Sequence, residues 1–113
     1  MSIDYILEKT PPVELLAGLA EEATELAQAA LKMRRVLDGT SPTPTTKEAA
    51  FEGLKEEIAD VLLFLHLLDL DRQRVEYKKT MQRKIARWTD RLRKKEVPPD
   101  GANRSQKLQG PAV

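Results

Sequence analysis

Residues 58–68 read I-A-D-V-L-L-F-L-H-L-L, and Asp60 and His66 are the only strongly polar side chains in this stretch. At about 3.6 residues per turn, its apolar side chains fall on every side of a helix. A helix that is apolar all round must be covered on all sides, and two neighbouring helices from so short a chain cover only part of it. The stretch therefore predicts an all-α bundle of long helices that is completed by oligomerisation.

The sequence before this stretch predicts a short helix followed by a long one. Residues 2–9 form the short helix, and the prolines at positions 11 and 12 open the long one, because proline is tolerated in a first helical turn. The long helix runs to about Asp38, where Gly39 supplies the C-terminal cap. A loop rich in proline, threonine and serine follows.

Two further long helices complete the expected set of three. Thr45 and Glu48 have the spacing of a capping box, which opens the second long helix, and this helix ends near Asp69. Asp71 is placed to cap the third, which runs to about Glu96. An apolar stripe on the third helix is expected to be core; its members are Tyr77, Met81, Ile85, Trp88 and Leu92.

Composition indicates one small folded domain with a tail. Hydrophobic residues make up 41% of the 113 positions and charged residues 33%, as in globular proteins. We expect an all-α domain over residues 1–96 and a flexible tail over residues 97–113, where apolar content is too low for packing. The absence of cysteine excludes disulfides and thiolate chemistry. No signal-peptide pattern and no apolar run of about 18 residues occurs, so a cytoplasmic protein without membrane partners is expected.

Two carboxylate motifs at helical spacing carry the strongest functional signal. Residues 21–25 read E-E-A-T-E and residues 57–60 read E-I-A-D, with 31 residues between the motifs. Residues three apart lie on one helix face, so two such helices packed together gather four carboxylates. Mg²⁺ binds oxygen ligands of this kind, usually together with substrate phosphates.

The helical wheel separates these acids from an ordinary solvated charge run. Glu22 falls in the apolar stripe of the first long helix, with Glu25 at its edge. Glu57 and Asp60 share a row with Phe64 on the second. A glutamate-rich surface helix is the usual meaning of such a motif, but carboxylates in apolar surroundings are costly unless cations compensate them. We therefore predict that these four acids bind metal.

The ordered pair of motifs resembles the MazG-like all-α nucleotide pyrophosphohydrolases, a superfamily that includes dimeric dUTPases and phosphoribosyl-ATP pyrophosphatases. The resemblance covers residues 12–92 and implies hydrolysis of a nucleoside triphosphate to the monophosphate and pyrophosphate. It implies Mg²⁺ as cofactor, with Mn²⁺ as a substitute, held by the same four acids that the wheel selects. Glu21 matches the first glutamate of the family motif, and the resemblance implies for it, as in some members, either support of the metal ligands from outside their shell or the role of a catalytic base that activates water.

Basic residues are concentrated in the last part of the chain. Residues 71–113 hold 13 bases and 5 acids (net +8), whereas residues 1–70 hold 13 acids and 6 bases (net −7). Lys79, Arg83 and Arg87 form a row along one helix face. Family members often carry K-x-x-x-N-x-x-R here; Lys79 fits, Arg83 replaces the asparagine, and Arg87 stands one residue late. We expect the row to bind substrate phosphates.

Two alternatives remain beside these expectations. A non-enzymatic helical oligomer could use its basic third helix to bind nucleic acid or a partner protein, but the net charge of −7 on residues 1–70 would repel a long polyanion. Lys32, Arg34 and Arg35 are expected to be solvated near a helix C-terminus, and contact with phosphates from a partner subunit is the lesser alternative for them. The sequence does not distinguish a dimer from a tetramer or reveal the preferred base.

Overall fold

The computed structural model describes residues 3–40 and 44–96. Over these ranges it forms four helices and no strand, which confirms the all-α prediction. The helices are α1 (Ile3–Lys9), α2 (Pro12–Asp38), α3 (Lys47–Leu67) and α4 (Arg74–Glu96). The expected tail at residues 97–113 lies outside the described ranges.

The ends of α2 and α3 follow from local capping chemistry. Gly39 adopts a left-handed conformation (φ 68°), and its N–H donates to the Arg35 carbonyl at 2.9 Å, so α2 ends as predicted. Thr46, rather than the predicted Thr45, caps α3, because its hydroxyl accepts from the Ala49 N–H at 3.1 Å. Glu48 is therefore two residues after the capping threonine, and not three as the predicted capping box requires.

The prediction that Asp71 caps the third long helix is wrong. That helix, α4, begins three residues later, at Arg74. The Asp71 carboxylate instead lies 2.8 Å from Nδ1 of His66, in the last turn of α3. This partner is five residues away in sequence, and the interaction holds the pKa of Asp71 below its usual value.

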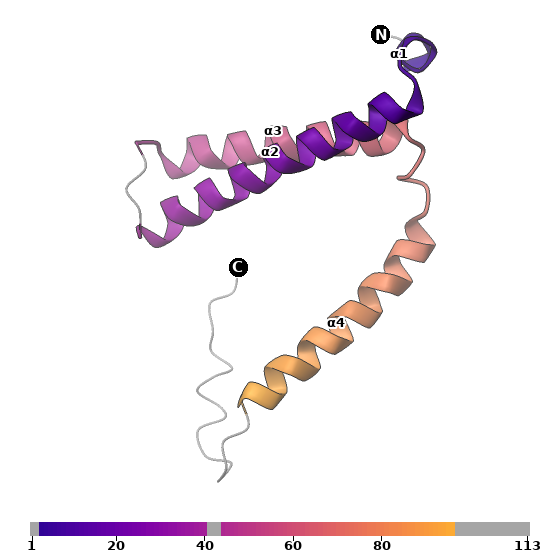
Figure 1. The fold of residues 1–113 in the computed structure, drawn as a ribbon. Helices are drawn as coiled ribbons and strands as arrows, with labels where there is room; N and C mark the ends of the chain where they lie inside the picture. The colour runs from indigo at the N-terminus through magenta and orange to yellow at the C-terminus, as the bar shows by residue number, and fades with distance from the viewer. Residues whose placement is uncertain (1–2, 41–43, 97–113) are drawn as a thin grey trace. The chain divides into compact units, whose positions relative to one another are not determined.

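Helices α2 and α3 run side by side as a helical hairpin (Figure 1). Leu15 near the start of α2, and Ala50 and Leu67 near the two ends of α3, are its buried apolar residues. Gly18 of α2 lies against the Phe64 ring, and a Cβ added at Gly18 would stand 2.6 Å from the ring Cζ. The missing side chain at position 18 thus permits the close approach of the two helices.

Much of the apolar surface of α3 is not covered by α2. Leu62 is 56% exposed and Leu63 45%, and Phe51 and Ile58 are also exposed. These residues include the centre of the stretch that is apolar all round. That a second subunit covers these side chains stays a prediction.

The described chain divides into two compact units, one ending at Arg72 and the other beginning at Gln73. The second unit contains α4 as its described helix. The apolar stripe of α4, predicted to be core, is exposed, and Trp88 is the clearest case at 62%. None of the helices in residues 3–40 and 44–96 is both long and apolar enough to cross a membrane.

Candidate metal centre

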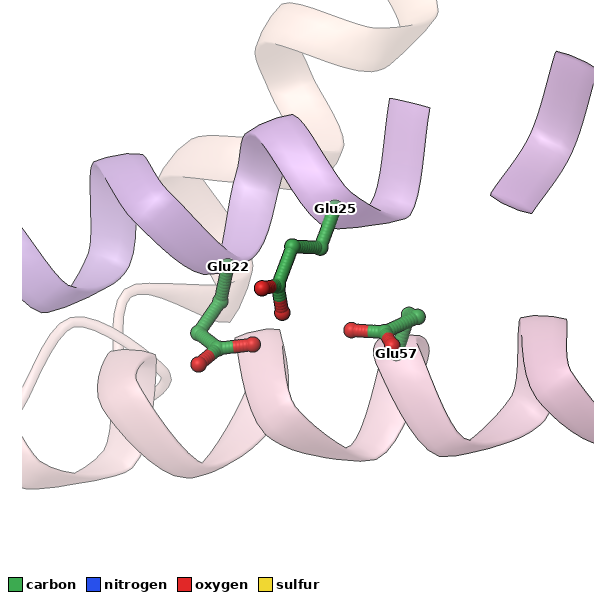
Figure 2. Close-up of side chains that lie close together, drawn as sticks. All are labelled: Glu22, Glu25 and Glu57. Atoms are coloured by element: carbon green, nitrogen blue, oxygen red, sulfur yellow. The ribbon is translucent and has the colours of Figure 1, made fainter. Parts of the chain in front are cut away.

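Three of the four predicted metal ligands converge between α2 and α3. Glu22 and Glu25 project from successive turns of α2, and Glu57 projects from α3 into the same space (Figure 2). One carboxylate oxygen from each lies within 4.8 Å of the other two. The three-residue spacing of the first motif and the pairing of the two helices produce this convergence. The three side chains thus meet as the motif spacing predicts, and their binding of a metal stays a prediction.

Two of the converging carboxylates carry buried oxygens without a partner. Glu22 Oε2 and Glu57 Oε2 are inaccessible to solvent, and no group of the described chain donates a hydrogen bond to them. An ionised carboxylate can only accept, and burying it without a donor or cation is costly. A proton or a cation bound by the cluster would remove this cost.

The pKa values of Glu22 and Glu57 also reflect the cost of ionising these carboxylates together. Burial raises the pKa of Glu22 from 4.5 to about 7, and a side-chain hydrogen bond with Glu25 and the charges of Glu25, Asp60 and Glu57 add to the effect. Burial also raises the pKa of Glu57, followed by the negative charges of Glu25 and Asp60. Because protons and metal ions compete for the same oxygens, a divalent cation could replace the proton on Glu22 near neutral pH.

Asp60 and Glu21 lie beside the cluster rather than in it. Asp60 is half-buried on α3, one turn beyond Glu57, and its charge acts on both Glu22 and Glu57. Its oxygens are not among those that converge within 4.8 Å. Glu21 is exposed and does not belong to the three converging carboxylates. Its charge is not among the causes that raise the pKa of Glu22 or of Glu57.

An open groove of about 450 Å³ continues from the carboxylates along α2 and α3. Glu25 and Glu57 stand among its lining residues, and Lys32 and Arg35 line it too. The remaining lining residues are small or neutral: Gln28, Ala29, Ala49, Ala50 and Gly53. The expectation that these bases are solvated holds for Lys32, which is exposed, whereas Arg35 is half-buried. That both line this groove was not predicted. Their spacing of seven and ten residues from Glu25, close to two and three helical turns, was the available signal.

The basic row of α4 belongs to the other unit. Lys79, Arg83 and Arg87 are all exposed, and the Arg83 guanidinium donates to the Thr80 hydroxyl at 3.1 Å. The row exists on α4 as predicted. The carboxylate cluster and the groove, in contrast, are built by α2 and α3 alone.

Comparison of the chain with protein-family models, with curated proteins and with solved structures found no match. The two motifs and the geometry of the α2–α3 hairpin are therefore the features that indicate a function.

Proposed function

We propose that the protein is a Mg²⁺-dependent nucleoside triphosphate pyrophosphohydrolase that releases a nucleoside monophosphate and pyrophosphate. The convergence of Glu22, Glu25 and Glu57, with buried oxygens that lack donors, is the observation that carries the proposal. A hard divalent cation satisfies such oxygens and commonly binds phosphates at the same time. The resemblance of the ordered motifs to the MazG-like superfamily supplies the reaction class.

The proposed chemistry divides among the named residues. Glu22, Glu25 and Glu57 hold the metal, and Asp60 completes the ligand set or adjusts its charge from the next turn. When bound, Mg²⁺ lowers the pKa of water and neutralises phosphate oxygens. Glu21, exposed beside the cluster, accepts the proton of the attacking water. Water attacks a phosphorus atom, and the bond from that phosphorus to the bridging oxygen of the departing pyrophosphate breaks.

The basic row of α4 has a place in the same proposal. Lys79, Arg83 and Arg87 would stabilise negative charge on the departing pyrophosphate. The proposal also includes a homo-oligomer, a dimer or a tetramer, in which a second copy covers exposed side chains such as Leu62 and Trp88. Burying apolar surface of this kind is the usual driving force for obligate assembly.

The test is Mg²⁺-dependent pyrophosphate release across a panel of ribo- and deoxyribonucleoside triphosphates. Glu57→Gln keeps the side-chain volume but removes a charge and a ligand, and we expect it to lower turnover by about 100-fold or more. Glu56→Gln is the matched control, because Glu56 precedes Glu57 but is exposed, and its charge is the smallest of the named influences that raise the pKa of Glu57. Circular dichroism checks that both variants keep their helices.

Two results would contradict the proposal. One is the absence of hydrolysis with every nucleotide and divalent metal tested; the other is equal activity of Glu57→Gln and Glu56→Gln. The rival function, nucleic-acid binding by α4, predicts metal-independent duplex binding whose affinity falls steeply with salt. That behaviour, combined with no hydrolysis, would favour the rival.

A further inference from the structure

The groove between α2 and α3 has an acidic end and a basic end. Glu25 and Glu57 mark the acidic end, and Lys32 and Arg35 lie further along α2 toward its C-terminus. At 1.5 Å per residue, Lys32 stands about 10 Å along the helix axis from Glu25, and Arg35 about 15 Å. The separation of opposite charges along one groove suits a ligand that is itself elongated and anionic at the basic end.

The two bases are available for such a ligand. Neither Lys32 nor Arg35 forms an ion pair with any carboxylate in residues 3–40 or 44–96, although acids and bases line the same groove. Arg35 is half-buried, so its side chain can adopt fewer conformations pointing away from the groove than that of an exposed arginine. Gln28 lies between the two ends and offers amide donors.

The floor of the groove is kept open by small residues of α3. A Cβ added at Gly53 would meet no atom within 4 Å, and Ala49 and Ala50 flank this position in the lining. The resulting space is bordered by donors and cations and belongs to a single unit. Groups held on one rigid hairpin are pre-organised, which lowers the cost of ordering them around a ligand.

We propose that this groove binds the polyphosphate of the substrate, with Lys32 and Arg35 as phosphate-binding residues. The inference rests on the proposed function and deepens it: the metal at Glu25 and Glu57 anchors one end of the phosphate chain, and the two bases hold the other. Arginine suits phosphate through paired N–H donors, and lysine through a compact charge. The phosphate-binding groups then include two residues of α2, in addition to or in place of the α4 row.

The structure provides a matched control one residue away from Arg35. Arg34 is on the same helix and carries the same charge, but its side chain is 75% exposed and its Nε lies 3.7 Å from the Asp38 carboxylate. It does not line the groove. Lys32→Gln, Arg35→Gln and Arg34→Gln therefore test position in the groove at constant loss of one positive charge.

The experiment measures binding of inorganic triphosphate to the full chain by calorimetry in excess Mg²⁺, and KM and kcat for the best nucleotide substrate. Loss of a charge-assisted hydrogen bond predicts a decrease in triphosphate affinity of about 10–100-fold for Lys32→Gln and for Arg35→Gln. Arg34→Gln should stay within about threefold of the wild type. In Lys32→Gln, KM should rise more than kcat falls, because binding of the phosphate chain is lost while the carboxylate cluster remains.

Failure of this inference can be told apart from failure of the proposed function. Wild-type affinity in both Lys32→Gln and Arg35→Gln, in a protein that still hydrolyses nucleotides with Mg²⁺, would overturn the groove proposal alone. An equal loss in Arg34→Gln would also overturn it, since a general charge effect would explain the data. A loss confined to Lys79→Gln would place the phosphates on α4 and overturn it as well. No triphosphate binding and no Mg²⁺-dependent hydrolysis in the wild type would refute both.

Discussion

The raised pKa of Glu22 predicts that pH controls both the stability of the metal-free protein and its response to Mg²⁺. The unfolded chain binds this proton with a pKa of 4.5, and the metal-free folded protein with a pKa of about 7. Between these values the folded state binds more protons, so its stability decreases as pH rises. The contribution is fully present below pH 4.5 and is lost as pH passes through about 7.

Mg²⁺ should reverse this loss only where the cluster is ionised. At a free Mg²⁺ concentration of ten times its Kd at pH 8, linkage predicts about 1.4 kcal/mol of stabilisation. For a domain of this size that corresponds to a rise in Tm of about 6–11 °C. At pH 5, about two units below the pKa of Glu22, the metal must displace a proton. The apparent affinity is then about 100-fold lower, and the same Mg²⁺ concentration should leave Tm unchanged.

The assay is thermal unfolding followed by far-ultraviolet circular dichroism at pH 5 and pH 8, with and without Mg²⁺. Glu22→Gln removes the titrating group and a metal ligand, so its Tm should not respond to Mg²⁺ at either pH. Without metal at pH 8, this variant should melt above the wild type, because one of the clustered like charges is gone. Glu56→Gln should respond like the wild type. Equal Mg²⁺ shifts at the two pH values, or equal shifts in wild type and Glu22→Gln, would show that Mg²⁺ does not replace a proton at Glu22.

Two further predictions concern packing. Gly53→Ala should stabilise α3 by about 1 kcal/mol, because a methyl group there meets no atom. Gly18→Ala gains the same helix propensity but pushes on the Phe64 ring, so urea unfolding should show it less stable than Gly53→Ala by about 1–3 kcal/mol. Equal stability of the two variants would disprove the close contact. Leu62→Asp should dissociate the proposed oligomer, because a charge would enter an apolar interface; sedimentation showing the wild type as a folded monomer at micromolar concentration would contradict this.

Local chemistry explains which parts of the fold were predictable. The bounds of α2 follow from proline in its first turn and from Gly39 at its end, and both signals act within a few residues. The cap of α3 was ambiguous because two adjacent threonines, Thr45 and Thr46, offer the same hydroxyl. The role of Asp71 was not predictable from spacing, since its carboxylate interacts with His66 on the preceding helix rather than with a helix N-terminus.

In the site, too, local sequence predicted some features and helix packing decided the others. Helical periodicity places Glu22 and Glu25 on one face and predicts their meeting with Glu57 once two helices pair. Periodicity does not fix how the helices are rotated and shifted against one another, and this decides that the Asp60 oxygens lie outside the converging set. The groove depends on the same packing, together with the small residues of α3, so the place of Lys32 within it appeared only in the structure.

The cluster and the groove share residues, and this joins metal and phosphate binding into one proposed site. Glu25 and Glu57 belong to both, whereas Glu22 belongs to the cluster alone. A cation held by these carboxylates would therefore lie at one end of the groove. Carboxylates and polyphosphate repel each other without that cation, so each should bind better when the cation is present. By thermodynamic reciprocity, the factor by which Mg²⁺ raises the affinity for triphosphate must equal the factor by which triphosphate raises the affinity for Mg²⁺.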